Sequence, residues 1–155
     1  MSDRGAELQR PEADLAEAQE AGQPSPDQSS NVLEFPTPLS SSGAEAIQIW
    51  TEGMQLADLC YQATQMFPPQ RAYGLDAQIR ITASSIPATL AQGYEQAAAA
   101  SYADCVERAR GALLELKSQL RFSERLSLVT PLINQILLEE CDLVRERLES
   151  LLVAA

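Results

Sequence analysis

The sequence has 155 residues, of which 45 % are hydrophobic and 5 % aromatic, and its formal net charge at pH 7 is −11. This length suits one domain with a tail, and a composition rich in Ala and Leu favours helices over sheets. Histidine is absent, which excludes sites that depend on an imidazole as base or metal ligand. No apolar run is long enough to span a membrane and no signal peptide is recognisable, so we expect a soluble cytoplasmic protein.

The first 43 residues are poor in large apolar side chains and rich in Glu, Gln, Ser and Pro, which predicts a disordered acidic tail over 1–43. This tail holds eight acidic and two basic residues, so its net charge is −6 and the remaining residues carry −5. A short helix over Pro11–Ala21 would be marginal in water. The apolar island Val32–Pro36, with Leu39 beyond it, is either a docking segment or, as we favour, part of a linker.

Residues 44–155 are predicted to form a helical domain, and its first helix spans about Ala44 to Met66. Apolar residues follow the three-four spacing of a helix along two neighbouring seams. One seam contains Ile47, Trp50, Met54, Ala57 and Tyr61, and the other contains Ile49, Leu56, Cys60, Ala63 and Phe67. So wide an apolar face needs more than one neighbour, in its own bundle or in another subunit. For Trp50 we favour an ordinary core position over an interface anchor.

A turn separates this helix from the second one. Pro68 and Pro69 prevent the first helix from continuing, and Tyr73-Gly74 supplies the turn. The second helix is predicted over about Leu75 to Gln96. Its apolar residues are spaced by three or four, which places them on one side.

Pro87 lies inside this second helix, where proline costs about 3 kcal/mol. Ser84 and Ser85 precede it and can donate their hydroxyls to backbone carbonyls, so we expect a kink over 83–87. The kink serves shape in our preferred interpretation. The alternative is a polar ligand site that uses Ser84, Ser85, Thr89 and Gln92.

The third helix is predicted over about Tyr102 to Leu126, with Ser101 as its N-cap. Gly111 inside it predicts a close approach to another helix, because glycine costs about 1 kcal/mol there relative to alanine. A stripe of basic residues follows the same helix: Arg110, Lys117, Arg121 and Arg125. It fits either the backbone of a nucleic acid or a set of salt bridges, and the acidity of the chain favours salt bridges.

The fourth helix is predicted from the N-cap Thr130 and Pro131 to about Val153. Its strong apolar stripe includes Leu132 and Ile136. The short link before it makes the last two helices antiparallel neighbours. The predicted fold class is therefore all-α, an antiparallel up-down four-helix bundle.

The three cysteines, Cys60, Cys105 and Cys141, lie in different apolar segments without C-x-x-C spacing. We predict reduced, buried thiols. The sequence also lacks a Gly-rich phosphate loop and the E-x-x-H pattern of di-iron bundles, so neither an enzyme nor a cofactor or metal site is expected.

The stretch from Phe67 to Tyr94 carries a family signature. Its F-P-x-x-x-x-Y-G-L turn is followed by a Q-I-R and an S-I-P element in one helix. The matching residues are Phe67-Pro68, Tyr73-Gly74-Leu75, Gln78-Ile79-Arg80, Ala83, Ser85-Ile86-Pro87, Ala91 and Gly93, with Gly111, Leu114-Glu115-Leu116 and Gln119-Leu120 farther on. The sequence thus resembles the bacterial four-helix bundle proteins of ribosomal RNA intervening sequences, which include the accessory variability determinant of diversity-generating retroelements.

Three positions depart from that pattern, because Ile81 replaces an arginine, Thr89 an asparagine and Gln92 a glutamate. The resemblance implies a homo-oligomer, with a pentamer as its form, and a partner such as a reverse transcriptase. Relatives of this type are basic, so the acidity of this chain weakens direct binding of nucleic acid.

We therefore predict a non-catalytic, self-associating scaffold that binds a protein partner or a ribonucleoprotein. The predicted interface residues are Trp50, Ile81, Pro87 and Gln92. The alternative function is a small-ligand binding helical bundle. A sealed apolar core with no cavity near Ser84 and Ser85 would exclude that alternative.

Overall fold

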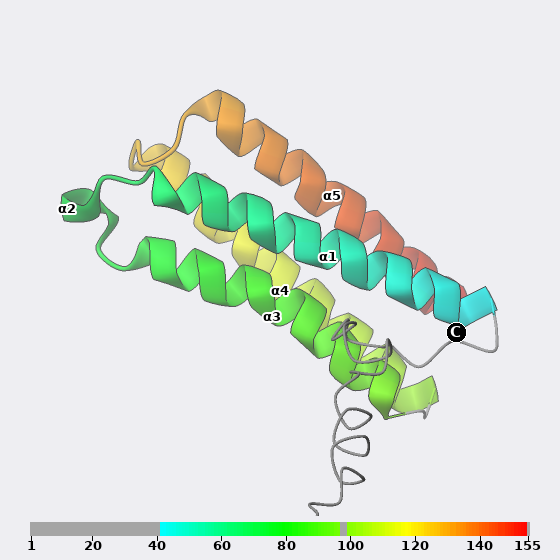
Figure 1. The fold of residues 1–155 in the computed structure, drawn as a ribbon. Helices are drawn as coiled ribbons and strands as arrows, with labels where there is room; N and C mark the ends of the chain where they lie inside the picture. Colours follow the sequence, from blue (N-terminus) through cyan, green and yellow to red (C-terminus); the bar gives the residue numbers. More distant parts are fainter. Residues whose placement is uncertain (1–40, 97–98, 155) are drawn as a thin grey trace, which may run out of the picture. The chain divides into compact units, whose positions relative to one another are not determined.

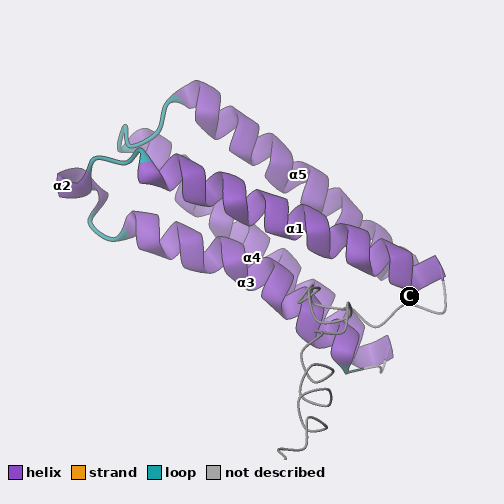
Figure 2. Cartoon of the chain, viewed as in Figure 1, coloured by secondary structure: helices purple, strands orange, loops and turns teal. Residues whose placement is uncertain are grey.

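A computed structural model describes residues 41–96 and 99–154 of the chain. These residues form five α-helices and no strand (Figures 1 and 2). The helices are α1 (Ser41–Gln65), α2 (Pro69–Ala72), α3 (Leu75–Glu95), α4 (Ala99–Arg125) and α5 (Pro131–Ala154). None of the described helices is long and apolar enough to cross a membrane.

The four long helices run alternately up and down, and each packs against two others (Figure 1). Both α1 and α4 pack against α3 and α5, so α1 lies diagonally across from α4. This arrangement confirms the predicted all-α bundle. It follows from the short connections, which turn each helix back along its predecessor.

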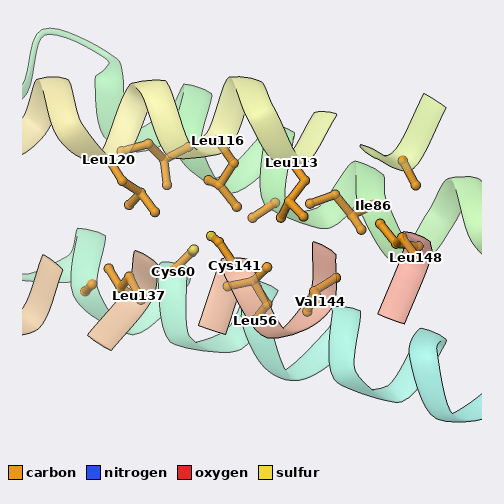
Figure 3. Packing of buried hydrophobic residues seen from close by; sticks show 14 of the residues in the cluster. Leu56, Cys60, Ile86, Leu113, Leu116, Leu120, Leu137, Cys141, Val144 and Leu148 are labelled. Carbon is orange, nitrogen blue, oxygen red and sulfur yellow. The ribbon is translucent and has the colours of Figure 1, made fainter. Parts of the chain in front are cut away.

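The core is built from one apolar stripe of each long helix. Figure 3 shows Leu56 and Cys60 of α1 opposite Leu113 and Leu116 of α4. The fully buried side chains with the largest volumes are Leu56, Ile79, Ile86, Leu90, Leu113, Leu116, Leu120 and Leu148, together with Val106, Val144, Asn134 and Pro87. Leucine and isoleucine from all four helices therefore fill the interior, as expected for interdigitating seams.

The helix boundaries agree with the sequence except at two places. The predicted turn contains the short helix α2, because Pro68 takes the extended N-cap conformation and Pro69 suits a first helical position. Tyr73 and Gly74 then turn the chain with φ values of 48° and 83°. The predicted N-cap Ser101 is wrong, since α4 already begins at Ala99. The predicted cap Thr130 is confirmed, because its Oγ1 accepts a hydrogen bond from Ile133 N at 3.4 Å.

The close helix approaches occur at other glycines than the predicted one. A Cβ added at Gly93 would lie 2.6 Å from Cys105 Cβ. The backbone of α3 at Gly93 therefore lies directly against the side chain of Cys105 on α4. Gly53 of α1 faces Pro87 of α3, with an added Cβ 3.5 Å from its ring. Gly111 is exposed, with no heavy atom within 4 Å of such a Cβ, so the predicted approach there is wrong within the chain.

The two predicted seams of α1 differ in their burial. The seam from Ile49 to Phe67 enters the core, whereas the other seam reaches the surface, with Met54 41 % and Tyr61 49 % exposed. On α5, Leu132 and Ile136 were predicted in the buried stripe but are exposed, because Asn134, Leu137 and Cys141 face the core instead. The expectations for Pro11–Ala21 and Val32–Pro36 lie outside the described residues.

Candidate interaction surface

A shallow groove of about 370 Å³ runs between α1 and α3 on the outside of the bundle. Its lining residues are Met54, Ala57, Asp58 and Tyr61 of α1 and Arg80, Ile81, Ser84 and Pro87 of α3. Ile81 is 69 % exposed in it, and Met54 and Tyr61 are also exposed. An exposed row of large apolar side chains beside a groove is typical of a surface that binds another protein.

Arg80 forms one wall of this groove and joins its two helices. Its Nε donates a hydrogen bond to Thr64 Oγ1 at 2.8 Å, and its guanidinium lies 4.5 Å from the centre of the Tyr61 ring. Thr64 in turn donates to backbone carbonyls of α1, which holds its hydroxyl in place. Arg80 therefore shapes the groove by fixing Tyr61.

Pro87 forms the buried floor at the other end of the groove, where it packs on Gly53. The helix continues through it, and the two serines before it donate to carbonyls one turn back. Ser84 Oγ donates to Ile81 O at 3.1 Å, and Ser85 Oγ donates to Thr82 O at 2.7 Å. Their hydroxyl hydrogens are thus engaged within α3, and the packing of Pro87 on Gly53 fits a role in shape.

The groove brings two of the four predicted interface residues together. Ile81 and Pro87 line it, whereas Trp50 and Gln92 do not. Trp50 is partly buried on α1, one turn before Met54, and Gln92 is exposed on α3 beyond Pro87. The sequence did not single out Met54, Tyr61 and Arg80 as interface residues, although the seam of α1 contained the first two.

A comparison with known protein families gives a match over most of the chain. The family model of the 23S rRNA-intervening sequence protein matches residues 45–150, which is more than half of the chain. The chain belongs to this family. Among curated proteins, none matches the sequence.

The F-P-x-x-x-x-Y-G-L turn of this 23S rRNA-intervening sequence protein family member holds one end of the bundle together. Arg71 lies on α2 inside the turn, and its Nη2 donates to Leu126 O at 2.8 Å, just after α4 ends. A cation at a helix C-terminus is favoured by the helix dipole. The turn therefore connects α1 to α3 and also caps α4.

The predicted basic stripe of α4 is divided into paired and unpaired residues. The Lys117 side chain is largely buried, and its Nζ lies 2.5 Å from Asp142 Oδ1 of α5. This hydrogen bond lowers the pKa of Asp142. Arg110 forms an ion pair with Glu107 of its own helix at 3.0 Å. Arg121 and Arg125 make no ion pair with a described residue and line a shallow depression with Ser118 and Phe122.

A buried polar contact between α4 and α5 was missed by the sequence reasoning. Asn134 is 0 % exposed, and its Nδ2 donates to Glu124 Oε2 at 2.6 Å. Its Oδ1 has no hydrogen-bond partner among the described residues. The available signal was an asparagine inside the apolar stripe of α5, which needs a polar partner when buried.

The three cysteines are free and buried, as predicted. Burial raises the pKa of Cys60 to about 12, and burial together with the neighbouring Cys60 raises the pKa of Cys141 to about 12. Such thiols are protonated at neutral pH and are poor nucleophiles. The described residues also contain no group of three Cys, Asp or Glu side chains placed to hold a metal ion.

Proposed function

We propose that this protein is a non-catalytic scaffold that associates with further copies of itself through the α1–α3 groove and then binds a protein partner. The observation that carries this proposal is the exposed apolar side chain of Ile81 beside Met54 and Tyr61. Full burial of an isoleucine contributes about 1.5–3 kcal/mol. Covering the 69 % of Ile81 that is exposed would contribute about 1–2 kcal/mol per copy.

A non-catalytic role is supported by the absence of histidine and by the buried, protonated thiols of Cys60 and Cys141. The family description names an intervening sequence of 23S rRNA, and this supports a role near a ribonucleoprotein. With a net charge of −11, the chain as a whole repels nucleic acid, which favours a protein as the direct partner.

The resemblance to the accessory determinant of diversity-generating retroelements makes the proposal more specific. It implies a closed ring of five copies and a reverse transcriptase as the partner. A head-to-tail contact whose rotation closes forms a ring, which covers the contact surfaces of every copy without forming an open fibre. A reverse transcriptase gene and paired template and variable repeats beside this gene would support that version, and a neighbourhood without them would refute it.

Light scattering on the intact protein tests the self-association. We expect the wild-type assembly to have a mass several times the 16.9 kDa of one chain. The Ile81→Asp variant should form smaller assemblies, so its measured mass should be lower. Leu132→Asp on α5 is a matched control, because Leu132 is 70 % exposed and does not line the groove. A wild-type protein that elutes as a monomer at micromolar concentration would refute the proposal, as would equal masses for Ile81→Asp and the wild type.

A further inference from the structure

The α1 side of the groove has the form of a hole in a coiled coil. Met54, Ala57, Asp58 and Tyr61 line it, at spacings of three, one and three residues. Four residues with this spacing surround the space into which one side chain of a facing helix inserts. We call these four residues the α1 hole. Because Met54 and Tyr61 are exposed, the hole is open to a side chain from another molecule.

The outward row of α3 carries one large side chain among small ones. Its residues are Ala77, Ile81, Ser84 and Ala88, all exposed, at spacings of four, three and four residues. This is the spacing of a coiled-coil seam. The distance between two packed helices depends on the side chains at their contact, so the small residues let another helix approach closely. Ile81, which is 69 % exposed, then projects from this row as a single knob.

The contact between Gly53 and Pro87 fixes the relative heights of α1 and α3. A Cβ added at Gly53 would lie 3.5 Å from Pro87 Cβ, so these two residues are level. The two helices run in opposite directions (Figure 1). Ile81, six residues before Pro87, is therefore level with Leu59, six residues after Gly53. That height lies within the span of the α1 hole, which extends from residue 54 to residue 61.

We propose that Ile81 of one copy inserts into the α1 hole of a second copy, so that α3 of one chain packs on α1 of the other. A closed assembly whose symmetry axis is parallel to the helices holds every copy at the same height. Ile81 then meets the hole without a shift along the helices. The inference rests on the proposed function, and it names the part of a second copy that occupies the groove.

The charges beside the knob and the hole are of opposite sign. α1 contains no lysine or arginine, and Asp58 of its hole makes no ion pair with a described residue. Arg80 directly precedes Ile81, is the one basic residue of α3, and also makes no ion pair within the described part of the chain. The acidic residues of α3, Asp76 and Glu95, lie near its two ends. Docking of Ile81 therefore brings a cation toward the carboxylate of the hole, which favours a second copy as the occupant.

Disulfide cross-linking of the full-length chain tests this contact. The variant Ala57→Cys places a thiol in the hole, and Ile81→Cys places one on the knob. The two variants are co-expressed and treated with oxidised glutathione. A cross-linked pair of about twice 16.9 kDa should form in the mixture, because a disulfide joins only cysteines that are in direct contact. Neither variant alone should give this pair.

Three controls accompany this experiment. Leu132→Cys replaces Ala57→Cys in a matched mixture and should give no cross-link with Ile81→Cys, because Leu132 is 70 % exposed on α5 and does not line the groove. The wild type should stay uncross-linked, since its three cysteines are buried. Far-UV circular dichroism would show that each variant is folded, and Met54→Cys gives a second reading of the same hole.

Two results would overturn the inference and leave the proposed self-association in place. One is a cross-link between two copies of Ile81→Cys, which would set knob against knob. The other is a mixture that keeps the mass of the wild-type assembly in light scattering but gives no cross-link for either hole variant. A wild-type protein with the mass of one chain would refute both proposals, and the groove would then belong to a different protein.

Discussion

Gly93 is the position where a single added methyl group tests the packing of α3 on α4 most directly. In Gly93→Ala, the new Cβ would lie 2.6 Å from Cys105 Cβ, 3.0 Å from Cys105 Sγ and 3.1 Å from Tyr102 Cδ2. The nearest of these atoms is attached directly to the backbone of α4. A rotamer change therefore cannot relieve the overlap, and the helices must move apart.

The free energy of this change has two opposing parts. Alanine in a helix interior is favoured over glycine by about 1 kcal/mol. Overpacking a well-filled core costs about 1–3 kcal/mol, and the shortest contact here is well inside normal van der Waals distance. The 2.6 Å contact places the overpacking cost in the upper part of this range, at about 2–3 kcal/mol, so we expect Gly93→Ala to lower the free energy of unfolding by about 1–2 kcal/mol.

Gly111→Ala is the matched control, because the same substitution is made in a helix but meets no atom within 4 Å. It should raise the free energy of unfolding by up to about 1 kcal/mol. Urea unfolding followed by circular dichroism at low protein concentration should separate the two midpoints by about 1–2 M. A Gly93→Ala midpoint equal to or above that of the wild type would refute the close approach of α3 and α4.

Three further predictions follow from the core. The pKa values of the Cys60 and Cys141 thiols are raised to about 12 in the folded protein. The free energy of unfolding therefore falls as the pH rises above about 9, because these thiols then lose their protons only in the unfolded chain. The slope is about 1.4 kcal/mol per pH unit per thiol, so the stability of Cys60→Ala in urea should depend less steeply on pH from 9 to 11. Asn134→Ala should cost about 1–3 kcal/mol in urea unfolding, because Glu124 loses a buried donor; a loss below 0.5 kcal/mol would contradict a role for this contact. Pro87→Ala should keep the helical content and change stability by less than about 1 kcal/mol, since a regained N–H offsets lost packing; loss of ellipticity at 222 nm would contradict this.

The sequence by itself determined the number and order of the long helices. The signals used are local in the sequence: helical spacing, the proline pair at 68–69 and the cap at Thr130. Such signals locate the ends of helices to within a few residues. The short helix α2 escaped prediction because four residues carry too little periodicity to distinguish a turn from a helix. Buried thiols were also predictable, since cysteine within an apolar stripe behaves as a small hydrophobe.

Only the tertiary structure decided which faces are covered. Spacing shows that Met54 and Tyr61 share a side of α1, but their exposure depends on where α3 and α5 contact that helix. For the same reason Gly93 marks a close approach and Gly111 does not, although both interrupt a helix. The spacing of residues shows which of them share a side of a helix. Which side faces the core is decided by the packing of the neighbouring helices, which are distant in the sequence.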